Sequence, residues 1–443
     1  MADISPFKGV VYNDEKVKNL SDVCTPPYDV ISRQEQQDFY ERHPNNMIRL
    51  ILGKPHENDD DQSNPHTRAS NFFRQWLSEN ILIQNSQPAI YLTSVRFSGN
   101  EEDYITRFGM ITLVRLEPFE KGIILPHEKT FSKVKSERLN LMKSCHVNFS
   151  PIFSLYQDPD NGILNQLKDF TCNMQPDMDF TDCKGLTHKA WRISDESLIQ
   201  IVTDKIKGKK LFIADGHHRY ETALNYREWM KQNNLAFTND HPANWTMMYL
   251  CSMDEPGLVI FPAHRLLNGL IKQKLDTFIK NTEKYFDKMV FKYDATNKEE
   301  MFIKFYSALK NNNGKNAIGV SIRKSSEFYI LTAKHGIMER LFSHELEKPL
   351  LNLDVNVLTR LVLMDILGFD QKALDDEKII TYTSNAKRAV DEVLQNNSDM
   401  AFILNPTKIE QVKEVAEQGL IMPRKSTYFY PKVITGQVMY KLY

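Results

Sequence analysis

The sequence is short of cysteines and of long apolar runs. Its 443 residues include five cysteines and no CxxC pair, which excludes a zinc or iron–sulfur site of that type and a disulfide-stapled miniprotein. We expect buried free thiols instead. The stretch from Thr359 to Phe369 is interrupted by Arg360 and Asp365, and no segment reaches the roughly 18 apolar residues that span a bilayer. A secretory signal is also missing from the first residues, so we expect a cytoplasmic protein.

The chain has no excess of either charge. Lys and Arg total 56 against 57 for Asp and Glu, which gives a net charge of -1. Such a balance provides no bulk attraction to nucleic acid or to an anionic membrane. No helix-turn-helix with a basic recognition face stands out either, so DNA binding is the weakest of the functions considered.

Several motifs of familiar enzymes are missing. The patterns GxxxxGK[ST], GxGxxG, GxSxG and HExxH do not occur. This disfavours a P-loop, a Rossmann dinucleotide site, an α/β-hydrolase and a metalloprotease helix. No metal site is marked by a protein motif.

Local patterns predict alternating strands and helices, so we expect an α+β (mixed α/β) fold. Ser32, with Glu35 at capping-box spacing, predicts a helix that runs to about Arg42. The apolar run from Met47 to Leu52 predicts a short strand, and the polar run 53–64 predicts a solvated loop. The other predicted elements are a helix at 67–79, strands at 89–97 and 104–116, a helix at 298–309 and strands at 317–322 and 428–430.

The most informative stretch runs from Lys210 to Leu224. It predicts a buried strand, a sharp turn at Asp215-Gly216, and a helix. The first turn of a helix leaves backbone N–H groups unpaired and carries about half a positive charge, so it is a natural seat for phosphate. Gly216 lets that backbone approach a ligand closely.

Three side chains add donors to the same turn. They are His217, His218 and Arg219. Arginine can hold phosphate with a bidentate fork. The stretch therefore predicts an anion site that opens onto a cavity. The alternative is that Asp215 only caps the helix while the imidazoles pack or face water. A carboxylate beside phosphate calls for a cation, so Asp215 could also orient Mg²⁺.

Two further segments carry candidate groups. Leu125 to Thr130 contains His127, Glu128 and Lys129, which offer a base, an acid and a cation on an irregular segment. A solvated loop is an equal alternative there. Near the carboxyl end, the stretch from Arg424 to Lys432 concentrates cations, hydroxyls and aromatic rings. The candidate phosphate ligands in it are Lys425, Ser426 and Thr427, while its tyrosines could instead anchor the terminus to the core.

The segment Asp215-Gly-His-His-Arg219 resembles the phosphate box of the ParB/sulfiredoxin-like nucleotide-binding fold, in the form seen in its free-serine kinases. Over nearly its full length the chain also resembles the uncharacterised family known as domain of unknown function 1015. The residues that carry this second likeness are Pro26–Ile31, Leu125–Thr130, Asn148–Phe153, Ala214–Glu221, Leu404–Thr407 and Lys425–Pro431. The family name implies no activity, so the kinase expectation comes from the fold-level likeness.

These resemblances imply a ParB/sulfiredoxin-like nucleotide-binding and catalytic region at residues 1–270, elaborated with insertions. A C-terminal α/β region would follow at 271–443, and its last segment would return to the site. The serine kinases of this fold imply an early acidic residue that takes the hydroxyl proton. Asp29, in a loop stiffened by Pro26 and Pro27, fits that position, and a turn-forming role for it is an equal alternative.

Our leading hypothesis is a phosphotransferase that uses Mg²⁺ with ATP or ADP and acts on a small hydroxyl-bearing metabolite, free L-serine first. Asp29, Glu128, Asp215 and His218 would be its catalytic residues. The predicted phosphate contacts are Gly216, His217, His218, Arg219, Lys129, Lys425, Ser426 and Thr427. The alternative is a nucleotide-binding switch or partner-binding module without turnover. The nucleotide, the acceptor and the oligomeric state are left open.

Overall fold

The computed structural model describes residues 1–99, 103–128 and 132–443. It forms two compact units, one of Met1–Val259 with Pro431–Tyr443 and the other of Ile260–Tyr430. The first segment of the first unit ends at Val259, whereas the sequence predicts a division after residue 270. The carboxyl-terminal segment belongs to the first unit.

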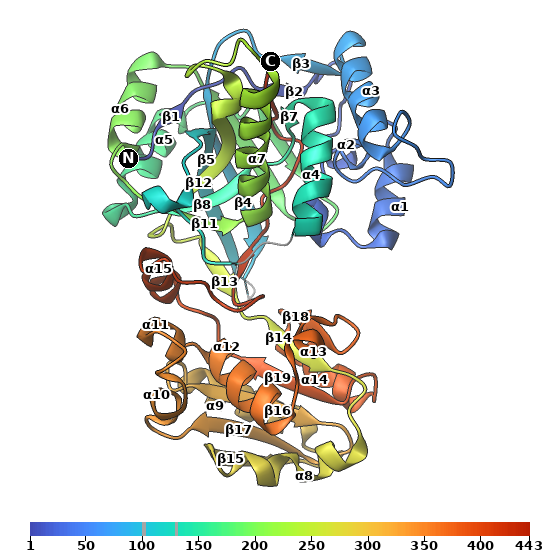
Figure 1. Ribbon diagram of the computed structural model, residues 1–443, viewed down its shortest axis with the longest axis vertical. Helices are drawn as coiled ribbons and strands as arrows, with labels where there is room; N and C mark the ends of the chain where they lie inside the picture. Colours follow the sequence, from blue (N-terminus) through green and yellow to red (C-terminus); the bar gives the residue numbers. More distant parts are fainter. Residues whose placement is uncertain (100–102, 129–131) are drawn as a thin grey trace. The chain divides into compact units, whose positions relative to one another are not determined.

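The first unit is built on a mixed sheet that has nine strands within the described residues (Figure 1). Its order is β6-β11-β8-β12-β5-β4-β10-β9, and β1 pairs with β5. The strands are β1 (Ile4–Ser5), β4 (Ile90–Ser98), β5 (Tyr104–Arg115), β6 (Ile124–Leu125), β8 (Ile152–Tyr156), β9 (Met178–Thr181), β10 (Thr187–Ile193), β11 (Leu211–Asp215) and β12 (Trp245–Ser252). The strands expected at 89–97 and 104–116 are confirmed as the antiparallel neighbours β4 and β5. Part of the turn expected between them, Asn100 included, lies outside the described residues.

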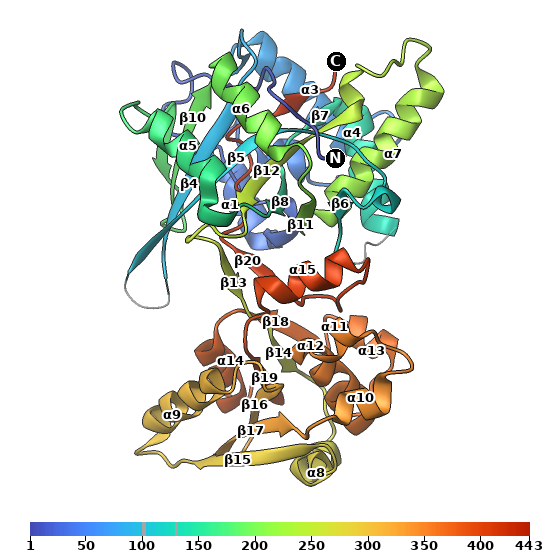
Figure 2. The same ribbon diagram turned by 90° about the vertical axis from the view of Figure 1, so that its left-hand side faces the viewer.

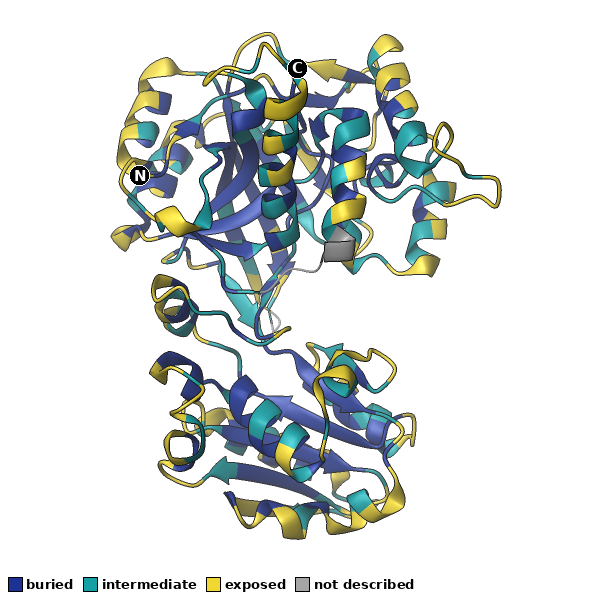
Figure 3. Cartoon of the chain, viewed as in Figure 1, coloured by how far each residue is buried: buried dark blue, intermediate teal, exposed yellow. Residues whose placement is uncertain are grey.

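Helices and short strands complete the first unit. The helices are α1 (Arg33–Arg42), α2 (Ile48–Ile51), α3 (Pro65–Ser78), α4 (Ser132–Cys145), α5 (Gly162–Thr171), α6 (Glu196–Ile206) and α7 (His217–Asn233). The pairs β2 (Val10–Tyr12) with β3 (Leu82–Gln84), and β7 (Val147–Asn148) with β21 (Tyr440–Lys441), form small ladders. Helix α7 packs against α4, and α4 against α3 (Figure 1). Figure 3 shows the central strands buried and the outer faces of these helices exposed.

The start of α1 is confirmed and the strand expected at Met47–Leu52 is wrong. Ser32 and Glu35 form the expected capping box, in which the Glu35 N–H donates to Ser32 Oγ at 3.2 Å. Met47–Leu52 instead contains the helical turn α2, and Asn46 Oδ1 accepts from the Ile48 N–H at its start. Short, continuous apolar runs are compatible with a buried helix as well as a strand.

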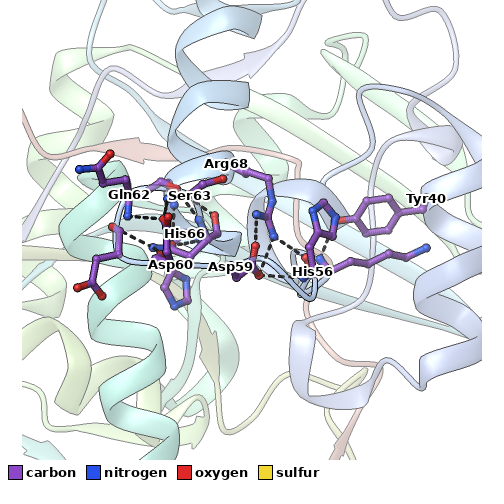
Figure 4. A network of polar contacts seen from close by, with 12 residues as sticks. Tyr40, His56, Asp59, Asp60, Gln62, Ser63, His66 and Arg68 are labelled. Carbon is purple, nitrogen blue, oxygen red and sulfur yellow. Dashed lines mark hydrogen bonds and ion pairs between the residues drawn. The ribbon is translucent and has the colours of Figure 1, made fainter.

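The loop 53–64 is irregular, as expected, but the carboxylates of Asp59 and Asp60 form polar contacts (Figure 4). The Asp59 carboxylate pairs with the Arg68 guanidinium at 2.5 Å. Asp60 Oδ1 accepts from the backbone N–H groups of Gln62 and Ser63. Asn64 then caps α3. These contacts offset the repulsion among the three aspartates.

The second unit has a six-stranded sheet within the described residues, in the order β15-β17-β16-β19-β14-β18. Its strands are β14 (His264–Leu267), β15 (Phe286–Lys292), β16 (Ala317–Ile322), β17 (Glu327–Ala333), β18 (Ile380–Thr383) and β19 (Met400–Leu404). A separate two-stranded ladder joins β13 (Val259–Phe261) to β20 (Tyr428–Tyr430), which confirms the strand expected at 428–430.

Helices α9 (Lys298–Asn311) and α14 (Ala386–Leu394) pack against the sheet of the second unit (Figure 2). Phe305, Ile403 and Val390 belong to the core between them. The predicted helix at 298–309 and strand at 317–322 are confirmed as α9 and β16. The remaining helices are α8 (Lys272–Thr282), α10 (Ile337–Phe342), α11 (Lys348–Leu351), α12 (Asp354–Val357), a π-helical segment Leu358–Ile366, α13 (Gln371–Asp375) and α15 (Ile409–Glu417).

The apolar runs and the cysteines of the sequence have clear counterparts in the structure. Within the described residues, no helix combines the length and the apolar character needed to cross a membrane. The cysteines are free, and Cys24, Cys145 and Cys251 are buried as expected. The expectation of burial is wrong for Cys172 and Cys183, which are exposed because they lie in the turns that follow α5 and β9.

Candidate functional site

The predicted strand, turn and helix at 210–224 are confirmed as β11, Gly216 and α7. Strand β11 is buried between β8 and β6. Gly216 has a φ of 92°, and a Cβ added there would lie 2.8 Å from Arg219 Nε. The turn therefore needs glycine both for its backbone conformation and for space.

Asp215 does not cap α7. Gly216 is the N-cap residue, and no side chain caps the helix among the described residues. The interpretation of Asp215 as a helix cap is therefore wrong. The start of α7 keeps the positive end of the helix dipole without a local carboxylate cap.

The Asp215 carboxylate instead joins two cations. Its Oδ2 accepts from Arg219 Nη2 at 2.5 Å, and its Oδ1 pairs with Lys432 Nζ. The three side chains are only 11–14% exposed. Burial alone would raise the pKa of Asp215, but the Lys432 and Arg219 charges hold it well below its usual range. The cluster of Asp215, Arg219 and Lys432 thus carries a net charge of about +1 in a nearly dry environment.

Lys432 was not among the predicted site residues. It ends the cation-rich stretch that begins at Arg424, but we singled out Lys425 within that stretch. Its partner Asp215 lies 217 residues earlier in the chain. Arg219 also donates through Nη1 to the Pro151 carbonyl, so the segment Asn148–Phe153 also contacts the cluster.

His127 and His217 meet in the interior behind the cluster. Strand β6 runs parallel to β11, and His127 lies two residues after its end, near the turn at Gly216. The His127 backbone N–H donates to His217 Nε2 at 3.2 Å, and the two rings meet edge to face with centroids 4.7 Å apart. Burial lowers the pKa of His127 to about 4 and that of His217 well below its usual range. Both imidazoles are therefore neutral at pH 7.

His218 lies nearer the surface than His217. Burial lowers the pKa of His218, while the carboxylates of Glu221 and Asp29 act in the opposite direction. Lys135, on α4, pairs with Glu221 at 2.5 Å. Asp29 is exposed in the turn Tyr28–Val30. Opposite charges therefore surround His218, and they come from helix α7, helix α4 and the loop after Pro27.

A cavity of about 70 Å³ adjoins the cluster, which is room for several water molecules. Two guanidinium groups line it, those of Arg219 and Arg138. Arg138 lies over the Tyr28 ring at 4.2 Å. Burial, followed by the Asp29 charge, raises the pKa of Tyr28 to about 12, so its hydroxyl is protonated at neutral pH. The lining also includes four polar residues, Asn148, Ser150, Thr222 and Thr246.

The structure brings some predicted residues together and not others. Asp215, Gly216, His217, His218 and Arg219 form one turn, and Asp29 acts electrostatically on His218. Glu128 follows His127 directly and is half-buried. Lys129 lies outside the described residues.

Lys425, Ser426 and Thr427 belong to the second unit. The Lys425 carbonyl accepts from Arg265, and Ser426 Oγ donates to the Pro423 carbonyl at 2.6 Å. Ser426 and Thr427 are buried. Their phosphate contacts stay predictions.

Asp215 does not fit as a magnesium ligand. Both of its carboxylate oxygens are occupied by cationic side chains. In the part of the chain that the structure describes, no group of three or more His, Cys, Asp or Glu side chains could hold a metal ion. We therefore derive no chemical step through a metal.

The sequence from residue 4 to residue 356 matches the family described as "Protein of unknown function (DUF1015)". The chain belongs to this family. No curated protein matches the sequence.

Several solved structures are similar to the chain at low identity. A conserved hypothetical protein from Pyrococcus furiosus is 13% identical, with a TM-score of 0.35, over 75% of this chain and 95% of that one. A free serine kinase in complex with AMP is 11% identical, with a TM-score of 0.35, over 75% and 91%. C-terminally truncated SbnI from Staphylococcus aureus is 10% identical, with a TM-score of 0.32, over 74% and 86%.

Proposed function

We propose that the protein is a nucleotide-dependent phosphotransferase with a ParB/sulfiredoxin-like nucleotide-binding region. Its donor would be ATP or ADP, and its acceptor a small hydroxyl-bearing metabolite, with free L-serine the leading candidate. The phosphates would lie at the start of α7, against Gly216 and Arg219.

One observation carries the proposal: the guanidinium groups of the buried Arg138 and of Arg219, whose side chain is 11% exposed, line a cavity beside a helix start that no side chain caps among the described residues. Arg219 keeps N–H groups beyond those that donate to Asp215 and Pro151. Arg138 pairs with the Glu137 carboxylate and donates to the Ile51 carbonyl, so only its remaining N–H groups can donate to phosphate oxygens. Lys432 neutralises Asp215, so the cluster keeps a net positive charge despite its carboxylate. An anion entering the cavity would balance that charge.

The reaction needs positioning, charge neutralisation and a base. The acceptor hydroxyl would give its proton to the Asp29 carboxylate as its oxygen attacks the terminal phosphorus. A new P–O bond forms, the phosphoanhydride P–O bond breaks, and the shortened nucleotide leaves with the electron pair. Arg219 and Arg138 would offset the negative charge on the transferred group and on the leaving oxygen.

A nucleotide-binding switch without turnover is the second candidate. It is favoured by the fact that neither Asp29 nor Glu128 lines the described cavity. A switch needs phosphate ligands only, whereas an enzyme also needs a base within hydrogen-bond reach of the acceptor.

A turnover assay separates the two. The protein would be mixed with L-serine and either ATP or ADP in magnesium-containing buffer, and phosphoserine measured by mass spectrometry. The enzyme hypothesis expects phosphoserine from the wild type. In Asp29→Asn it expects the rate of phosphoserine formation to fall at least about 100-fold, while nucleotide binding is retained.

Glu128→Gln tests the second carboxylate in the same way, and Asp14→Asn, at an exposed aspartate of the same unit, is the matched control. Nucleotide binding without any phosphorylated product, from serine or from other small hydroxy compounds, would leave the switch as the function.

A further inference from the structure

The first unit has a second cavity, of about 470 Å³, farther along α7. Tyr226, which lines it, lies nine residues after His217, or about 13 Å along the helix axis. The described linings of this cavity and of the cavity beside Arg219 share no residue. It is large enough for a small organic ligand.

Arg74, on α3, supplies a cation to this cavity. Its side chain is exposed, and it has no ion pair or hydrogen bond with any residue that the structure describes. Burial, followed by the Arg74 charge, lowers the pKa of His146. Burial raises the pKa of Tyr443, and the Arg74 charge opposes that rise. No Asp or Glu belongs to the described lining. A guanidinium in this setting is suited to hold a carboxylate.

Aromatic rings form the wall beside Arg74. His146 stacks on Trp229 with ring centroids 6.4 Å apart, and it meets Tyr443 edge to face at 6.0 Å. The His146 Nδ1 is hydrogen-bonded to the buried Tyr226 hydroxyl at 2.6 Å. This contact fixes the ring although His146 has a φ of 55°, a backbone conformation that is unusual for a histidine.

The other polar side chains of the described lining are neutral. Burial lowers the pKa of His146 and of His241. His241 Nδ1 accepts from the Ala243 N–H at 3.1 Å. Burial raises the pKa of the Cys145 thiol to about 12, so it is not a nucleophile at neutral pH. Among the side chains of the described lining, the positive charge therefore comes from Arg74.

We propose that this cavity binds a small planar aromatic carboxylate. The carboxylate would pair with Arg74, and the ring would lie against His146 and Tyr443. Flat aromatic rings pack favourably on such walls.

The test measures the binding of three probes by calorimetry. Benzoate has both the planar ring and the charge, benzamide lacks the charge, and cyclohexanecarboxylate lacks the planar ring. We expect benzoate to bind at least about tenfold more tightly than either of the others. Failure of benzoate to bind at about 10 mM, or equal affinity for benzoate and benzamide, would overturn the proposal.

Two variants sharpen the test. Arg74→Gln should weaken benzoate binding at least about tenfold, while Arg33→Gln, at an exposed arginine of the same unit, should leave it unchanged. His146→Asn removes the ring but tolerates the positive φ, and it should also weaken benzoate. An unchanged benzoate affinity in Arg74→Gln would contradict the assignment. The benzoate affinities are measured without nucleotide, so their outcome does not depend on the phosphotransferase proposal.

Discussion

Each unit of the chain holds an arginine that is largely shielded from solvent, but the two are surrounded differently. In the first unit, Arg219 pairs with Asp215 and lines a cavity. In the second, Arg265 is 4% exposed, donates to the carbonyls of Ala263 and Lys425, and lies 5.4 Å from the Tyr382 ring centroid. No carboxylate pairs with Arg265 among the described residues.

The difference separates a structural cation from a candidate ligand site. Burial lowers the pKa of Arg265 to about 10, yet it stays charged at neutral pH because carbonyl groups accept its hydrogen bonds. Arg219 shares its carboxylate with Lys432, so its cluster has one cation in excess beside a cavity. The cavity beside Arg219, rather than burial, marks the candidate site.

The largest effect is expected at Asp215. Asp215→Asn leaves the two cations of the cluster without their carboxylate, and we expect a loss of about 3–5 kcal/mol in the free energy of unfolding. Urea denaturation of the purified protein would measure it. Adding Lys432→Met to this variant should restore part of the loss. A single variant as stable as the wild type would show that the carboxylate does not hold the cluster together.

Acid should weaken both units through their buried histidines. His127 has a pKa of about 4 in the folded protein against 6.5 for an exposed histidine, so the unfolded chain binds the proton first. Its contribution is fully present above pH 6.5 and is lost as the pH falls to about 4. The free energy of unfolding should fall by about 3 kcal/mol over this range.

His264, in the second unit, has a pKa of about 3. The free energy of unfolding of that unit therefore keeps falling until the pH reaches about 3. Urea denaturation between pH 7.5 and 4 would show the slope. His127→Gln should flatten it over that range, and an unchanged slope would mean that His127 titrates normally.

Arg265→Met should cost less than Asp215→Asn. It leaves carbonyl acceptors unsatisfied but no buried charge, so we expect about 1–3 kcal/mol. Hydrogen exchange would assign the loss to the second unit, and nucleotide affinity should not change. A loss as large as that of Asp215→Asn would erase the distinction between the two arginines.

The smallest effects are expected at two helix caps, one in each unit. Ser32 caps α1, and Asn385 accepts from the Arg388 N–H at 2.8 Å at the start of α14. Ser32→Ala and Asn385→Ala should each cost about 1 kcal/mol. Hydrogen exchange should place each loss in its own unit, and a loss spread over both would mean that the units unfold together.

Local features of the fold could be predicted from the sequence because their causes are local. Ser32 and Glu35 are three residues apart, and the turn at Gly216 depends on the missing Cβ. The run Met47–Leu52 was predicted wrongly because continuous apolar residues suit either a buried helix or a strand. In the structure, Asn46 Oδ1 accepts a hydrogen bond from the Ile48 N–H at the start of the helical turn, a contact that the hydrophobic pattern does not encode.

The candidate site was only partly predictable. The turn from Asp215 to Arg219 is contiguous, so its residues could be named together. The pairing of Asp215 with Lys432 joins distant segments and depends on tertiary structure. The contrast between the interior His217 and the outer His218 depends on how β6 lies beside β11, which no local pattern encodes.

The most direct test of the account is calorimetry of ADP binding to the wild type and to Arg219→Gln. Lys432 still neutralises Asp215 in this variant, so it should fold. We predict that ADP binds the wild type and that its affinity falls at least about tenfold in the variant. Equal affinity in the two proteins, or no binding of ADP or ATP to the wild type, would contradict the assignment of this turn as a phosphate site.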